Sequence, residues 1–172
     1  MKANKPEVWL RGKVEGVPNL LQPAAHALLQ SCEEVEKYIQ DFPEDLLWEK
    51  PAGRASVGFH LQHLTGVVDR MLTYAKAEKL SENQFQYLKN EGKPNQEISP
   101  AFLVKNFQDK VDEAIDFLKN TPENILTENR AVGRRELLST VIGLLFHAAE
   151  HSQRHVGQLL VTVSFLMENR EI

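Results

Sequence analysis

The sequence has little of what secreted, membrane-spanning or nucleic-acid-binding proteins require. Its single cysteine, Cys32, excludes an internal disulfide and suits the core of a protein in a reducing compartment. No apolar run approaches the length of a membrane span, and residues 1–18 lack the apolar core of a secretory signal. The 20 basic and 24 acidic residues are interspersed, with a net charge of −4, so no basic patch indicates nucleic-acid binding. We therefore expect a cytoplasmic protein that binds neither membranes nor nucleic acid.

Several catalytic motifs are also missing. There is no glycine-rich phosphate loop and no motif that would activate Ser152 or Cys32 as a nucleophile. In EHSQRH (150–155) the glutamate precedes the first histidine, unlike the HExxH motif of zinc metalloproteases. A di-iron carboxylate bundle requires two Glu-x-x-His motifs and two further glutamates, which Glu150 and Asp69 do not supply. These four kinds of chemistry are therefore disfavoured.

What the sequence does contain is helical periodicity. With 42% apolar residues, the 172-residue chain can bury one core, and we expect a single domain over residues 1–172. Apolar residues recur at steps of three and four, as one face of a helix requires, in four segments: 20–40, 56–77, 99–121 and 139–163. Four helices of this length, joined by connections of mixed length, predict an all-α four-helix bundle.

The segments between these helices carry weaker patterns. Ser81 and Gln84 form the capping-box pair of an extra short helix that we expect to end near Gly92. Residues 121–136 have no clear period and are expected to cross over the bundle. Residues 1–19 contain several glycine or proline breaks and predict an extended N-terminal arm.

Four single residues carry local predictions. Trp9 and Leu10 are the expected anchors of the N-terminal arm. Gly157 interrupts the last helix, which predicts the close approach of another helix or of a ligand. Trp48 either covers the functional site or, as is more common for such a tryptophan, packs over a helix end.

The histidines are the main functional clue, because five of the six fall in two of the predicted helices. His147, His151 and His155 are spaced four apart, so each is turned only about 40° from the one before, and neighbours rise by about 6 Å. Two adjacent imidazoles can therefore bind one ion, with a third from His60 or His63 on the facing helix. Such a three-nitrogen site leaves a coordination position free, as in catalytic zinc sites, and also suits nickel, iron or copper.

A purely structural role for the histidines is the alternative. A single histidine on an apolar helix face, such as His26, is usually a hydrogen-bonded packing residue. Several buried imidazoles are harder to explain in this way, because each needs partners for both ring nitrogens.

Two segments, SVGFHLQHLTGVVDRMLTYA (56–75) and LLFHAAEHSQRHVGQLLV (144–161), resemble the DinB-like, or YfiT-like, superfamily of metal-dependent enzymes. The resemblance implies an up-down-down-up bundle with His63, His151 and His155 as the metal ligands. It also implies zinc or nickel as the divalent metal ion, and a homodimer. Some members of the superfamily are transferases or isomerases that use a low-molecular-weight thiol.

The remaining polar residues near these expected ligands are open to more than one role. His60, His147 and Gln158 could contact a bound water, a substrate or a ligand, or could be structural. Glu150 and Arg154 lie about 100° from the neighbouring ligands around the helix and are expected to be polar flanks.

Three functions follow from this reading. The first is a metal-dependent hydrolase or thiol-dependent transferase acting on a small-molecule substrate through a three-histidine site. The second is a bundle that binds a metal or small ligand without catalysis. The third is a structural bundle whose histidines serve only in packing.

Overall fold

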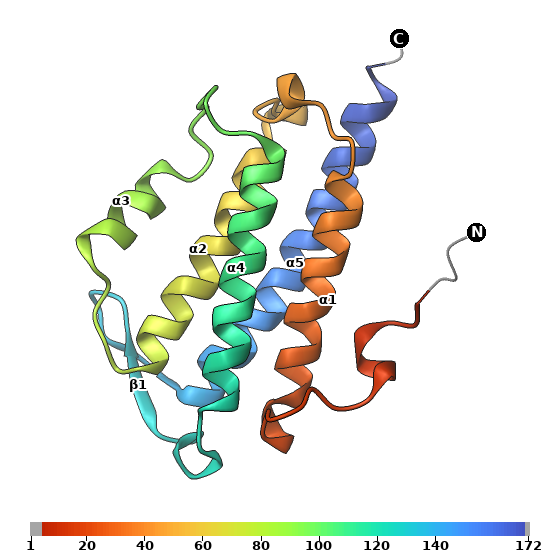
Figure 1. Cartoon of the computed structure of the whole chain (residues 1–172). Coiled ribbons are helices and arrows are strands. Elements are labelled where there is room, and N and C mark those ends of the chain that lie inside the picture. Colours follow the sequence, from red (N-terminus) through yellow and green to blue (C-terminus); the bar gives the residue numbers. More distant parts are fainter. Residues whose placement is uncertain (1–4, 171–172) are drawn as a thin grey trace.

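The computed structural model describes residues 5–170 and consists mainly of five α-helices (Figure 1). Their bounds are α1 Gln22–Ile39, α2 Val57–Ala75, α3 Glu82–Asn90, α4 Pro100–Lys119 and α5 Val141–Glu168. None of the helices in this part of the chain is long and apolar enough to cross a membrane. The predicted all-α architecture is confirmed.

The four long helices form a bundle of up-down-down-up topology. In Figure 1, α1 and α5 run upward and α2 and α4 run downward. Helix α2 packs against α4 and α5, and α1 packs against the same two helices, so α1 and α2 lie at opposite corners. As a result, α2 and α5 are antiparallel neighbours, and side chains from both can meet between them.

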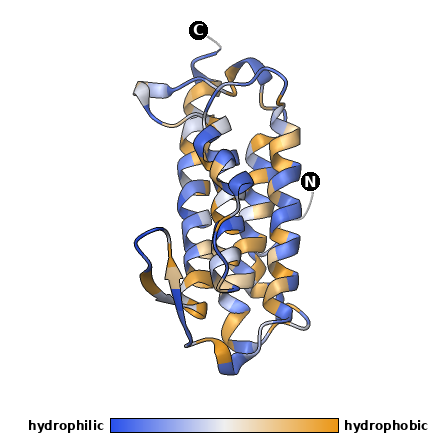
Figure 2. Cartoon of the chain, turned by 90° about the vertical axis from the view of Figure 1, so that its left-hand side faces the viewer, coloured by the Kyte–Doolittle hydropathy of each residue, from blue (hydrophilic) through white to orange (hydrophobic). Residues whose placement is uncertain are grey.

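The core lies along the bundle axis because each long helix has one apolar face. Leu61, Leu64, Val68 and Leu72 of α2, for example, recur at steps of three and four and are all buried. Figure 2 shows the alternation of apolar and polar bands that this spacing produces along the helices. The structure therefore confirms the apolar periodicity as the basis of the fold.

The predicted helix starts are confirmed by their caps. The side chains of Ser56, Ser99 and Thr140 each accept a backbone N–H three residues further on, which satisfies an otherwise unpaired donor. Ser81 and Gln84 form the complete capping box at the start of α3. Helix α5 continues to Glu168, beyond the predicted end at residue 163, because no glycine or proline follows to stop it.

Residues 121–136 were predicted to cross over the bundle, but they enter a small β-hairpin. Strands β1, Asn129–Val132, and β2, Leu137–Thr140, pair in antiparallel fashion. Gly133 and Glu136, at each end of the connecting turn, have positive φ angles. The hairpin escaped prediction because its strands have four residues each, and their sequences, NRAV and LLST, do not alternate apolar and polar residues as a longer half-buried strand would.

Residues 5–19, the described part of the N-terminal arm, pack along α1 at two 3₁₀ turns, but the predicted anchors are wrong. Trp9 and Leu10 are 59% and 58% exposed, whereas Val8 and Val17 are buried. The reason is a turn of 3₁₀ helix at Val8–Arg11, which directs the first of its side chains inward. The Val8 N–H also donates to Oε1 of Gln30 in α1, at 2.9 Å.

Two glycines of the long helices have opposite surroundings. A Cβ atom on Gly58, in the first turn of α2, would lie 2.5 Å from the ring of Trp48, so this tryptophan packs over a helix end. Gly157 has nothing within 4 Å of the corresponding position, so the predicted close approach of another helix is wrong for the described part of the chain, and the approach of a ligand stays a prediction.

These surroundings predict opposite effects of the same substitution. Gly58→Ala should destabilise the fold by about 1–3 kcal/mol, because the methyl group overlaps the Trp48 ring. Gly157→Ala should stabilise it by about 0.5–1 kcal/mol, because alanine favours a helix and meets no obstacle. Urea unfolding of both variants measures the two changes, and equal changes of the same sign would contradict the packing described.

Candidate metal centre

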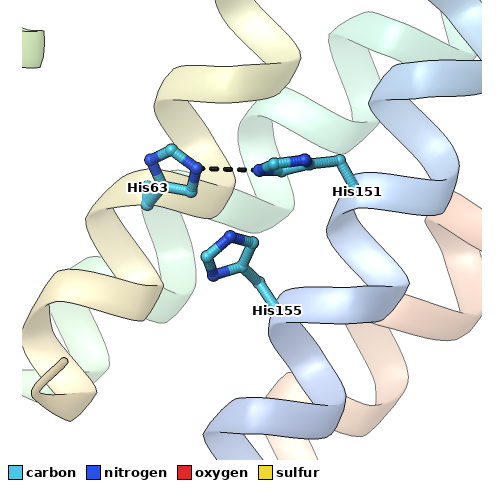
Figure 3. A group of neighbouring side chains, drawn as sticks. All are labelled: His63, His151 and His155. Atoms are coloured by element: carbon cyan, nitrogen blue, oxygen red, sulfur yellow. Dashed lines mark hydrogen bonds between the residues drawn. The ribbon is translucent and has the colours of Figure 1, made fainter. Parts of the chain in front are cut away.

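Three imidazoles converge between α2 and α5. His63 comes from α2, and His151 and His155 come from successive turns of α5. One ring nitrogen of each lies within 4.8 Å of the corresponding atoms of the other two. Figure 3 shows the His63 and His151 rings facing each other, with the His155 ring pointing toward the line that joins them. The Nε2 atoms of His63 and His151 are 2.9 Å apart.

The helix geometry explains this convergence. A step of four residues on α5 places the rings of His151 and His155 one above the other, with centroids 4.7 Å apart. His63 lies opposite this pair, at centroid distances of 5.2 Å and 4.5 Å from them. Thus the structure brings together the three residues that the DinB resemblance implied.

Glu91 orients His63. The Nδ1–H of His63 donates to Oε2 of Glu91 at 2.7 Å, which leaves the Nε2 lone pair of His63 free to face the centre. The Glu91 side chain is only 4% exposed and also accepts from Nη1 of Arg70, at 2.6 Å. A carboxylate that holds the outer nitrogen of a histidine is the usual support of a metal ligand.

Gly66 makes room for this carboxylate. A Cβ atom at residue 66 would lie 2.3 Å from Oε1 of Glu91 and 2.6 Å from Nη1 of Arg70. His63, Gly66 and Arg70 are three and four residues apart and so share one face of α2. Gly66 and Arg70, a small and a charged residue on an otherwise buried face of α2, were a signal in the sequence for a polar group packed against that face. Glu91 itself had none, because it lies outside the regular helices.

His60 lies against His155. It is 2% exposed, and its Nδ1 lies 3.1 Å from Nδ1 of His155, within hydrogen-bonding distance. With Nδ1 of His155 engaged in this way, Nε2 is the nitrogen left for the centre. His60 is therefore placed to fix the orientation of His155, which is one of the roles considered for it.

Phe59 stacks on the His63 ring, with 5.2 Å between the ring centroids and an angle of 12° between the ring planes.

The other flanking residues lie on the outer side of His151. Nη2 of Arg154 donates to Nδ1 of His151 at 3.1 Å, and also to the Glu150 carboxylate. Nδ1 of His147 lies 2.8 Å from Oε1 of Glu150. Arg154 thus contacts His151, and Glu150 contacts Arg154 and His147; that they are polar flanks stays a prediction. Gln158 is exposed, and its backbone carbonyl accepts from Thr162; its role stays a prediction.

Burial keeps the central imidazoles neutral. Burial, reinforced by the neighbouring His63, lowers the pKa of His60 and that of His151 to about 4. The same two causes lower the pKa of His155 to about 3. Neutral imidazole is the form that binds metal ions.

The hydrogen-bond pattern also fixes where the protons lie. Because Nδ1 of His151 accepts from Arg154, the proton of a neutral ring is on Nε2 and points at Nε2 of His63. An ion at the centre would replace this proton. The donor set therefore fits a divalent ion: it consists of three imidazoles, one of which is held by a buried carboxylate.

The two candidate nucleophiles play no part at the centre. Ser152 is fully buried and donates to the backbone oxygen of Ala148 at 2.7 Å. Cys32 is half-buried against the core, and burial raises the pKa of its thiol to about 12. Both side chains act in packing.

Comparison with known proteins agrees with this geometry. The family model of the DinB superfamily matches residues 13–159, which is most of the sequence. The chain belongs to the DinB superfamily. A crystal structure of a protein from Streptococcus pneumoniae, solved by a structural genomics consortium, superposes with a TM-score of 0.63 at 12% sequence identity. The superposition covers 88% of this chain and 91% of the other, and at this identity it supports the fold alone. Among curated proteins, none matches the sequence.

The low histidine pKa values predict that the metal-free protein loses stability in mild acid. Since the folded-state values of about 4, 4 and 3 lie below the ordinary value of about 6.5, the unfolded chain binds more protons in this range. Stability from these groups is complete above pH of about 6.5 and falls as the pH drops toward the folded values.

The measurement is the urea midpoint of metal-free protein at pH 7.5 and at pH 5. The midpoint should be lower at pH 5, and His60→Gln should reduce this difference, whereas His26→Gln on α1 should leave it unchanged. An equal midpoint at both pH values would contradict neutral, buried imidazoles.

Proposed function

We propose that His63, His151 and His155 bind a divalent metal ion, zinc or nickel, and that the protein is a metal-dependent hydrolase or thiol-dependent transferase. The convergence of three imidazole rings carries this proposal, together with the outer nitrogen of one of them, Nδ1 of His63, which donates to buried Glu91. Membership of the DinB superfamily adds to it. The substrate would be a small molecule.

A divalent ion held by three imidazoles retains a free coordination position, where it can acidify a bound water or bind a thiolate. The residues of this chain would hold that ion in a defined place. Glu91 fixes the His63 ring, His60 fixes the His155 ring, and Phe59 covers one face of His63. Since the buried rings stay neutral, they remain able to bind metal in mild acid.

The first test is metal content. Protein purified without a polyhistidine tag, loaded with Zn²⁺ and dialysed, should retain one equivalent by elemental analysis. His63→Ala and His155→Ala should lose it, because two imidazoles bind far less tightly than three. His26→Ala is the matched control, since its ring lies on α1 and contacts the carbonyl of Gly12. Retention of the ion by both ligand variants would contradict the proposed ligands.

Catalysis is tested separately from binding. Hydrolysis of an activated ester and conjugation of a low-molecular-weight thiol to a chromogenic electrophile are measured with metal-free and metal-loaded protein. A catalytic centre should turn over only when it is loaded, and a chelator should abolish the activity. Tight metal binding with no turnover would favour a non-catalytic binding protein instead.

Glu91 provides a second, independent prediction. Glu91→Gln should weaken Zn²⁺ binding by about 10- to 100-fold, because the amide holds the His63 ring less firmly than the carboxylate does. Glu113→Gln, on the exposed surface of α4, is the control. Calorimetric titration measures the affinity, and circular dichroism verifies that the variant is folded, since Arg70 loses its charged partner. An unchanged affinity would show that Glu91 does not support the ligand.

A further inference from the structure

A second set of metal-binding side chains lies on the outer side of His151. His147, Glu150 and His151 each offer one ligand atom, and these atoms lie within 4.8 Å of one another. Glu150 and His151 are three and four positions after His147, so both side chains lie one turn of α5 from that of His147. Imidazole and carboxylate together suit zinc and related divalent ions.

A positive charge already lies among these atoms. Nη2 of Arg154 is 2.8 Å and 2.9 Å from the two carboxylate oxygens of Glu150, and 3.1 Å from Nδ1 of His151. His147 contacts the same carboxylate, at 2.8 Å. The guanidinium is permanently charged and can only donate, so it fills the place that an external cation would take.

We infer that the histidine array contains two adjacent cation positions, and that Arg154 fills the outer one. The outer position is formed by His147, Glu150 and Nδ1 of His151. Its ligand in the absence of Arg154 is a divalent metal ion. The inference rests on the proposed function in one respect, namely that Nε2 of His151 serves the inner ion. With both positions filled, the two ring nitrogens of His151 would serve one ion each, and the ring would release its one N–H proton to solvent.

Arg154 can be removed without damage to the fold. Its side chain is 52% exposed and that of Glu150 is 33% exposed, and ion pairs at such positions contribute little to stability. Arg154→Met keeps a side chain of similar length and removes only the charge and its hydrogen bonds. The protein as it exists should therefore bind one ion, and this variant should bind two.

The experiment is a calorimetric titration of metal-free, tag-free protein with Zn²⁺. Wild type should bind one equivalent. Arg154→Met should bind a second Zn²⁺ ion. The affinity for this second ion should be at least about tenfold higher than for any second ion that wild type binds, because a neighbouring positive charge is lost. Arg135→Met, at an exposed position in the hairpin turn, is the control and should behave as wild type.

Double variants assign each equivalent to its ligands. Arg154→Met/His147→Ala should lose only the second ion, and Arg154→Met/His155→Ala should lose only the first. A single equivalent in Arg154→Met, or equal second-site affinity in wild type and variant, would overturn the inference.

Failure of the proposed function gives a different result. If wild type bound no ion while Arg154→Met bound one that required His147 but not His155, the inner site would be wrong and the outer position would stand. If neither protein bound an ion, both proposals would be wrong.

Discussion

The centre depends on the antiparallel packing of α2 against α5 at the level where Nε2 of His63 meets Nε2 of His151, 2.9 Å away. A hydrogen bond to the outer nitrogen of each ring fixes the two imidazoles in this position. Buried Glu91 takes the outer proton of His63, and Arg154 donates to the outer nitrogen of His151. The lone pair of one ring and the proton of the other are thereby directed into the space between the helices, where an ion would replace that proton.

The supporting residues connect the centre to a part of the structure outside the four-helix core. Helix α3 has no buried side chain and contacts α2 through polar groups: Gln84 donates to Asp69, and Tyr87 donates to the backbone oxygen of Gln62. Glu91 follows directly after α3. The absence of a side chain on Gly66 allows this carboxylate to approach α2 closely. The position of the short helix therefore affects the orientation of a proposed metal ligand.

Much of this arrangement could be predicted from the sequence, because periodicity and capping act locally. The caps at Ser56 and Thr140 and the shared face of His151 and His155 follow from residues a few positions apart. Contacts between residues far apart in the sequence gave no such local signal. Glu91 lies 28 residues from His63 and belongs to no periodic pattern, and the sequences of the short hairpin strands, NRAV and LLST, do not alternate apolar and polar residues. Helix geometry left the facing ligand open between His60 and His63, and only the family resemblance favoured His63.

X-ray absorption spectroscopy of zinc-loaded, tag-free protein tests the central claim most directly, because it counts the imidazoles bound to the ion. The account predicts three histidine nitrogens at about 2.0–2.1 Å, with the remaining coordination filled by a light atom such as a water oxygen. A spectrum with one imidazole or none, or one dominated by carboxylate oxygens, would contradict a centre built from His63, His151 and His155.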